Sequence, residues 1–163
     1  MGKINLLRVD DRLIHGQVMT KWSKGMGTNA IYVVDNDTAA DDFMKDIYIS
    51  TNSSSGLKIG VFSTTEAIEE WEKNQFGSDN VILLFKTIKA AKEVIDHGIP
   101  AVALNIGGIA KKTNATFVIN TVGLTREDGE LLKQLHEEKN IEVTFQTVPD
   151  TKKVSLEEAL KAL

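Results

Sequence analysis

The chain of 163 residues contains no cysteine. This absence excludes a disulfide framework, thiol catalysis and thiolate metal sites. Long apolar runs are missing too, since the charge-free stretch 113–125 is too short and too polar to span a bilayer. There is no basic excess either, because 19 basic residues face 23 acidic ones. A net charge of −4 is too acidic for a nucleic-acid binder that works through bulk charge.

A secretory leader is not indicated. Residues 1–10 meet two charges before any long apolar run and have no small-residue cleavage site. Hydrophobic residues make up 42% of the chain, which is enough for one core without covalent staples. We therefore expect a soluble, cytoplasmic protein in which residues 1–163 form one domain.

Short apolar runs alternate along the chain with segments of helical period. The predicted strands are 4–9, 30–34, 57–62, 81–85, 101–106, 117–122 and 141–148, and the predicted helices are 16–26, 39–49, 65–74, 88–97, 126–139 and a short terminal helix at 156–163. Several of the strands have almost no polar alternation, as in strands covered on both faces. The pattern predicts an α/β fold, an open, mostly parallel twisted sheet of about six to seven strands with helices on both faces.

Capping signals support several of these boundaries. Ser63 three residues before Glu66 resembles a capping box, and Thr125 stands in the same way before an acidic first turn. In the acidic turn 35–38, a carboxylate is interpreted as the cap of the second helix. The Ser-rich run 53–56 is interpreted as a loop.

The segment 8–18, where the first predicted strand ends, is rich in charged and titratable residues. The chain has only three arginines, and Arg8 and Arg12 both lie here. A guanidinium suits an oxyanion such as phosphate, because its planar fork binds two oxygens at once. Ligands of open parallel sheets gather at the carboxyl ends of the strands. This segment is therefore the first candidate for a functional site.

His15 lies near a predicted helix start, where unpaired backbone N–H groups favour an anion. A neutral imidazole can act as a nucleophile without prior activation, and Gly16 leaves room for a phosphoryl group or a partner's backbone. Asp10 or Asp11 is within sequence reach to hold one ring nitrogen in its tautomer. The same carboxylates could instead cap the helix, and a lone histidine near a helix start is often structural.

The other candidate sites are weaker. His97 at a predicted helix end and His136 on a charged helix are interpreted as structural. Without cysteine or a paired histidine spacing, no metal site is expected. The pair Gly107 and Gly108 matches neither nucleotide-binding glycine motif, so no nucleotide is expected. This pair is either a tight turn or a wall that allows close approach to His15.

Trp22 admits two interpretations. Val18, Trp22 and Met26 recur at a four-residue spacing, which places them on one helix stripe facing the sheet. This spacing favours Trp22 as a core residue, although an aromatic side chain near the segment 8–18 could also contact a partner.

The segment 8–18, with Trp22 beyond it, resembles the opening of the enzyme IIB component of the mannose/fructose/sorbose family of the bacterial sugar phosphotransferase system. The block Asp-Asp-Arg-Leu-Ile-His-Gly-Gln carries the resemblance. It extends over nearly the whole chain through the turns 33–37 and 105–108 and the closing segment 146–149. The run 49–56 departs from the family, which often has an Ala-Ala-Pro-like turn there.

The resemblance implies that His15 is phosphorylated through Nδ1, with Arg12, Asp10 and Asp11 as further catalytic candidates. Phosphorylated enzyme IIA would be the donor, and a hexose-type sugar held by the membrane components IIC and IID would be the acceptor. The chain would thus be a phosphohistidine–sugar phosphotransferase component at the cytoplasmic side of the permease. No metal or cofactor is required, because such transfer depends on positioning and charge stabilisation. The candidates for binding the phosphoryl group or a partner are Arg8, Gly16, Gln17, Asn105, Gly107 and Gly108.

Two other functions remain open at this point. Phosphatases with an Arg-His-Gly motif also form a phosphohistidine, but here Ile14 precedes His15, and Arg126 is the one arginine left elsewhere to clamp a monoester. A regulatory or orphan IIB-like module would dock partners without delivering sugar phosphate, and the intact His15 and Arg12 argue against it. No residue indicates which sugar is transported, since in this family the sugar sits in the membrane components.

Overall fold

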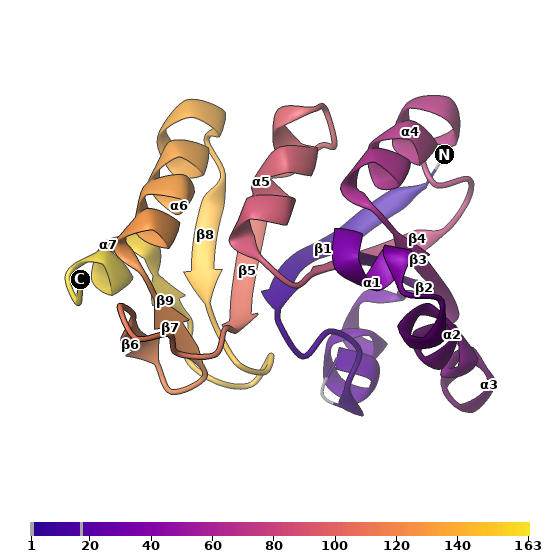
Figure 1. Ribbon diagram of the computed structural model, residues 1–163, viewed down its shortest axis with the longest axis horizontal. Helices are drawn as coiled ribbons and strands as arrows, with labels where there is room; N and C mark the ends of the chain where they lie inside the picture. The colour runs from indigo at the N-terminus through magenta and orange to yellow at the C-terminus, as the bar shows by residue number, and fades with distance from the viewer. Residues whose placement is uncertain (1, 17) are drawn as a thin grey trace.

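The computed structural model describes residues 2–16 and 18–163. Seven strands form one sheet in the order β3-β2-β4-β1-β5-β8-β9, parallel except for β9, which runs antiparallel to β8 (Figure 1). The strands are β1 (Lys3–Asp10), β2 (Ala30–Val34), β3 (Lys58–Phe62), β4 (Asn80–Phe85), β5 (Ala103–Gly108), β8 (Glu142–Phe145) and β9 (Val154–Ser155). The predicted open, mostly parallel sheet is confirmed.

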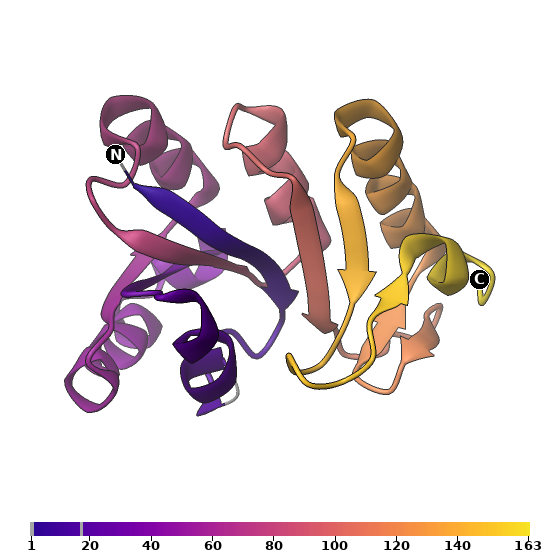
Figure 2. The same cartoon turned by 180° about the vertical axis from the view of Figure 1, so that it is seen from behind.

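Helices cover both faces of this sheet. One face carries α4 (Thr64–Asn74), α5 (Ile88–Asp96) and α6 (Arg126–Lys139), which stand in front of the strands in Figure 1. The other face carries the π-helical turn η1 (Val18–Trp22), the 3-10 turn η2 (Lys24–Met26), α1 (Asn36–Ala40), α2 (Asp42–Ser50) and α3 (Asn52–Ser55). Of these, η1 and η2 stand in front of the strands in Figure 2. The short α7 (Leu156–Leu160) follows the edge strand β9.

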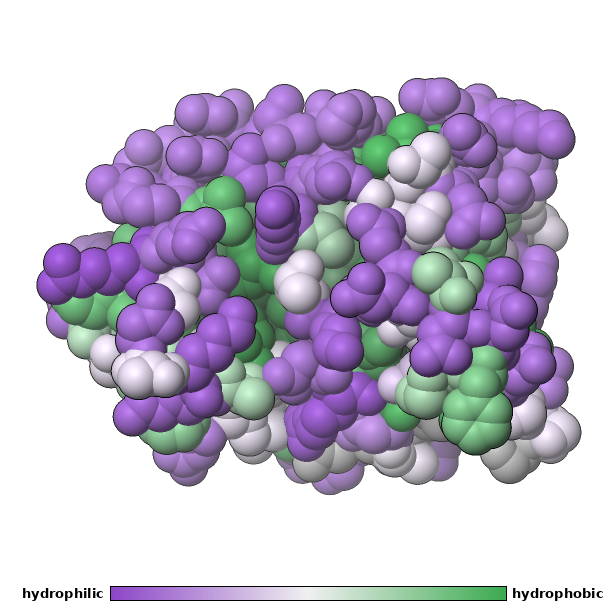
Figure 3. All heavy atoms as spheres, in the orientation of Figure 1, coloured by the Kyte–Doolittle hydropathy of each residue, from purple (hydrophilic) through white to green (hydrophobic). Residues whose placement is uncertain are grey.

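Side chains that alternate along the strands build two cores. In β2, Tyr32 and Val34 enter the core beneath α4, α5 and α6, whereas Ile31 and Val33 enter the core on the opposite face. This explains why the strands read as unbroken apolar runs, since each residue is buried on one face or the other. The outer surface over α4, α5 and α6 is mostly hydrophilic (Figure 3).

The two predicted capping boxes are confirmed, whereas α2, which covers most of the predicted second helix, is capped by Asp41 and not by a carboxylate of the turn 35–38. Ser63 and Glu66 form a reciprocal capping box at the start of α4, and Thr125 forms one with Asp128 at the start of α6. Asp35 accepts a hydrogen bond from the backbone N–H of Thr38 and so caps α1. Each cap satisfies backbone donors that a helix start leaves unpaired.

Several predicted segments differ in the structure. The predicted helix 39–49 is divided at Asp41 into α1 and α2, and the predicted strand 141–148 ends at Phe145. The segment 117–122 is not one strand, because the turn at residues 120–121 divides it into the hairpin β6 (Thr116–Ile119) and β7 (Val122–Leu124) outside the main sheet. From residue 18 on, the predicted helix 16–26 consists of the short turns η1 and η2, which end at the left-handed Gly27. Glycines at 25 and 27 weaken a regular helix there. The expected loop 53–56 contains the helical turn α3.

Trp22 is a core residue. Its side chain is 7% exposed and packs with Ile31, Val33 and Leu84, and Met26 packs against the same cluster. The side chain of Val18, the third member of the predicted stripe, lies outside what the structure describes. Among the described residues, no helix combines the length and the apolar character needed to cross a membrane.

We expect Trp22→Ala to lower the free energy of unfolding by about 3–5 kcal/mol, because it leaves a cavity in this core. Chemical denaturation measures the change, with Phe43→Ala as a control at a side chain that is 73% exposed. Unchanged stability of Trp22→Ala together with weaker partner docking would instead make Trp22 an interface residue.

Candidate active site

The loop after β1 brings His15 back toward the end of that strand. The backbone N–H of Asp11 donates to the Gly108 carbonyl at 2.8 Å, and that of Leu13 donates to the Asp10 carbonyl at 2.9 Å. Leu13 has a φ of 57°, a left-handed conformation that is uncommon for a residue with a side chain. Its side chain is only 2% exposed, so burial of the leucine holds the strained turn.

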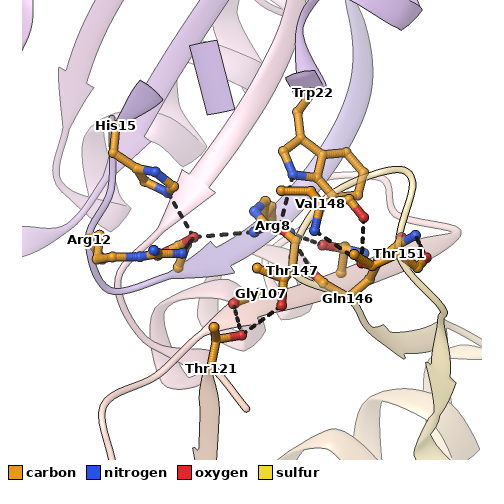
Figure 4. Close-up of polar contacts among 12 residues, drawn as sticks. Arg8, Arg12, His15, Trp22, Gly107, Thr121, Gln146, Thr147, Val148 and Thr151 are labelled. Atoms are coloured by element: carbon orange, nitrogen blue, oxygen red, sulfur yellow. Dashed lines mark hydrogen bonds and ion pairs between the residues drawn. The ribbon is translucent and has the colours of Figure 1, made fainter. Parts of the chain in front are cut away.

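The buried carboxylate of Asp10 is the centre of the site. Its Oδ2 accepts hydrogen bonds from His15 Nε2 at 3.0 Å, from Arg12 Nη2 at 3.0 Å and from Arg8 Nη2 at 3.3 Å (Figure 4). Its Oδ1 accepts from the backbone N–H and from Nε of Arg12, each at 3.1 Å. The contact to His15 occupies Nε2 and leaves Nδ1 as the second ring nitrogen.

The charges of this site stabilise one another. Burial disfavours the ionised form of Asp10, but hydrogen bonds from Arg12 and His15 and the charge of Arg8 outweigh it, and the pKa of Asp10 is lowered. The hydrogen bonds to Asp10 in turn raise the pKa of Arg12. Asp10 is therefore ionised, and it holds the Nε2–H tautomer of His15 by accepting that proton's hydrogen bond.

Arg8 does not lie where a phosphoryl group could reach it. Its side chain is fully buried, and its guanidinium donates to Asn105 Oδ1, to the carbonyl of Gln146 at 2.9 Å and to the carbonyl of Thr147 at 2.8 Å. The guanidinium also stacks over the ring of Trp22, 4.7 Å from its centroid. Burial lowers the pKa of Arg8 to about 10. The interpretation of Arg8 as a direct phosphate ligand is therefore corrected.

Gly107 and Gly108 face the side chains of β1 and not a phosphoryl group. A Cβ at Gly107 would overlap the Arg8 guanidinium, and a Cβ at Gly108 would collide with the Asp10 carboxylate. Asn105, the register partner of Arg8 on β5, is likewise buried and accepts its hydrogen bond. The two glycines leave room for the buried side chains of Arg8 and Asp10. Neither predicted role, a tight turn or a wall that allows close approach to His15, describes this.

Asp11 and Gly16 lie around the exposed side of the site. Asp11 Oδ2 accepts from the backbone N–H of Ala110 at 2.7 Å, so Asp11 fixes the loop while Asp10 contacts His15. Gly16 is exposed, with open space where a side chain would stand. Gln17 lies outside the described residues.

The other histidines have structural contacts. His97 Nδ1 bonds the Glu93 carbonyl at 2.8 Å, and His136 Nδ1 bonds the Ile141 carbonyl at 2.9 Å. Within residues 2–16 and 18–163, no cluster of three or more histidine or acidic residues could hold a metal ion.

Sequence reasoning missed the part of the site that comes from the segment after β8. Gln146 and Thr147 supply two carbonyls to Arg8, and Thr147 also accepts from Trp22 Nε1 at 3.4 Å. The available signal was a glutamine inside the predicted apolar strand 141–148, since an amide buried there needs hydrogen-bond partners.

The lowered pKa of Asp10 predicts how stability depends on pH. Ionised Asp10 contributes stability that is fully present above its unfolded-state pKa of about 3.9 and is lost as the pH falls through the lower folded-state value. We expect Asp10→Asn to lower the free energy of unfolding at neutral pH by about 3–5 kcal/mol, because Arg8 is left buried without its counter-charge. Its stability should also decline less below about pH 4 than that of the wild type.

Denaturant unfolding across this pH range makes the comparison, with the exposed Asp37→Asn as a matched control. Stability curves of Asp10→Asn and wild type that run parallel below about pH 4 would show that Asp10 is not the linked group.

Comparison with known proteins places this geometry in a family. Residues 4–163 match the model of the sorbose subfamily IIB component of the phosphotransferase system. The sorbose-specific EIIB component of Lacticaseibacillus casei is 33% identical over 82% of this chain and 81% of its own length. The mannose-specific EIIAB component of Escherichia coli K12 is 31% identical over 98% of this chain, which spans 47% of that relative.

Solved structures agree. The structure of manxB from Thermoanaerobacter tengcongensis matches 99% of this chain and 96% of its own with a TM-score of 0.90 and 39% identity. The IIBSor domain of the sorbose permease from Klebsiella pneumoniae matches 99% of this chain and 98% of its own with the same TM-score and 26% identity. The chain is therefore a phosphoryl carrier of the sugar phosphotransferase system, and it belongs to the sorbose subfamily of IIB components.

Proposed function

We propose that His15 accepts a phosphoryl group from phosphorylated enzyme IIA on Nδ1 and passes it to a hexose-type sugar held by the membrane components IIC and IID. The observation that supports this most is the contact of His15 Nε2 with the buried Asp10 carboxylate. This contact holds the proton on Nε2 and leaves the lone pair of Nδ1 for attack. His15 is 19% exposed, which leaves part of the ring open to a partner.

The transfer needs no cofactor. The Nδ1 lone pair attacks the phosphorus while the bond between the phosphorus and the donor histidine breaks. The electron pair of that bond returns to the nitrogen of the donor. The new phosphohistidine ring gains positive charge, which the ionised Asp10 stabilises through Nε2–H. In the second step a sugar hydroxyl oxygen bonds to phosphorus, the electron pair of the breaking Nδ1–P bond returns to Nδ1 and leaves the ring neutral, and the hydroxyl proton passes to water.

Arg12 is the proposed stabiliser of the moving phosphoryl group. Its Nε and Nη2 already bond Asp10, so the phosphoryl oxygens would meet the opposite edge of the guanidinium. Its side chain is 44% exposed, unlike that of Arg8. Asp10 thereby holds the arginine beside His15 before any phosphate arrives, which lowers the reorganisation that transfer requires.

The partners follow from the same proposal. The name of the Escherichia coli mannose relative combines IIA and IIB in one chain, which supports IIA as the donor of this chain. We propose a protein–phosphohistidine–sugar phosphotransferase component that works as one domain at the cytoplasmic side of its permease. A chain that accepts phosphate without any sugar phosphate being formed would instead be a regulatory module.

His15→Ala should fold and accept no phosphate from phosphorylated IIA, because the nucleophile is removed. Acid-labile phosphate on the purified chain is the readout, with His97→Ala as the control that keeps full incorporation. If His15→Ala still takes up phosphate while His97→Ala does not, the assignment of His15 as the phosphorylated residue is wrong.

Arg12→Lys should lower the rate of transfer from IIA far more than it lowers stability. Lysine keeps the charge but not the planar fork, and losing one preorganised donor raises the barrier by about 3 kcal/mol. Rapid-quench kinetics measures the rate, with the exposed Arg126→Lys as the control. A wild-type rate in Arg12→Lys would remove Arg12 from the mechanism.

A further inference from the structure

We propose that Arg8 is a positioning residue for His15 and that the segment after β8, residues 146–151, holds Arg8 in place. The segment would then set the orientation of His15 through a chain of buried contacts. This inference rests on the proposed phosphorylation of His15 and deepens it.

The Arg8 guanidinium is enclosed by protein. Nη1 donates to Asn105 and to the Gln146 carbonyl, while Nη2 donates to the Thr147 carbonyl and to Asp10. The side chain is fully buried, so it meets neither solvent nor a docking partner. Of its contacts, the one with Asp10 leads directly to His15.

Asp10 transmits that effect to the reacting ring. Arg8 Nη2 and His15 Nε2 bond the same oxygen, Oδ2, at 3.3 and 3.0 Å. The other cationic partner of this carboxylate, Arg12, also bonds Asp10, but it is partly exposed, and the opposite edge of its guanidinium would engage a phosphoryl group. Arg8 is the fixed partner, because its side chain is fully enclosed. It can therefore keep Oδ2 aimed at Nε2 while Arg12 engages the phosphate.

The segment 146–151 is itself held from several sides (Figure 4). The Gln146 amide donates to the carbonyls of Pro149 at 3.1 Å and Thr151 at 2.7 Å, which folds the segment back on itself. Thr147 Oγ1 lies 3.0 Å from Thr121 Oγ1, and Thr121 bonds the Gly107 carbonyl. Its two carbonyls are thus presented to Arg8 in one arrangement.

Gly107 offers a way to move Arg8 without removing it. An alanine methyl at Gly107 would overlap the guanidinium, so Gly107→Ala shifts Arg8 while every charge of the site remains. Arg8→Lys keeps the charge but lacks the fork that spans Asp10 and the two carbonyls. Gln146→Leu leaves Arg8 intact and removes the two side-chain hydrogen bonds by which Gln146 helps to fold the segment.

Two measurements on the full chain test the proposal. Nitrogen-15 chemical shifts of the His15 ring report the population of the Nε2–H tautomer without any partner. Single-turnover kinetics with phosphorylated IIA separates the maximal rate from the half-saturating donor concentration. Both are calculated for the folded fraction of each variant. Arg126→Lys and Gly25→Ala are the matched controls, because both sites are exposed and a Cβ at Gly25 meets nothing.

We expect Arg8→Lys and Gly107→Ala to lose the Nε2–H preference and to transfer at least about 10-fold more slowly, at an unchanged half-saturating concentration. Gln146→Leu should change both readouts in the same direction and by less. Should Arg8→Lys fail to fold, the other two variants decide the question.

Tautomer populations and rates equal to those of the controls, in folded variants, would overturn the proposal. So would a raised half-saturating concentration at an unchanged maximal rate, since that indicates a docking role. A wild-type chain that accepts no phosphate would refute the proposed function alone, because the tautomer measurement still decides whether Arg8 orients His15.

Discussion

The burial of one carboxylate, that of Asp10, constrains the whole region around His15. An ion removed from water loses several kcal/mol of solvation unless partners replace it. Arg8, Arg12 and His15 replace it together, and the resulting pKa of Asp10 lies below its usual value despite the burial. A carboxylate shared in this way is satisfied in one arrangement only, so the cluster specifies the geometry of the loop more than it adds to stability.

This constraint explains features of the neighbouring backbone. The register of β1 against β5 shifts between Val9 and Asp10, beside the glycine pair that leaves room for the buried ionic side chains. The loop then turns through the left-handed Leu13, whose buried side chain anchors it in the core beneath η1. The strained backbone at Leu13 and the space at Gly107 and Gly108 thus both help to fix the position of the imidazole.

Much of the fold could be predicted because it depends on local patterns. Apolar runs and caps such as Ser63 place most strands and helices within a few residues of their observed bounds. The hairpin at 116–124 was missed because a turn of ordinary residues interrupts an apolar run. In the candidate site, the segment around His15 could be predicted from composition. The role of Gly107 could not, because Gly107 is skipped where the register of β1 and β5 shifts, and its contact is with the far end of the Arg8 side chain.

Arg8 and Arg12 show why residue type alone does not assign a role. Both stand two residues from Asp10, one before it and one after it. Alternation along β1 places Arg8 on the same face as Asp10, inside the protein. The strand ends at Asp10, so that alternation no longer applies and Arg12 emerges on an exposed turn. The carboxylate therefore joins an arginine that is fixed within the fold to one that is available to a phosphoryl group. The end of the strand separates the two roles.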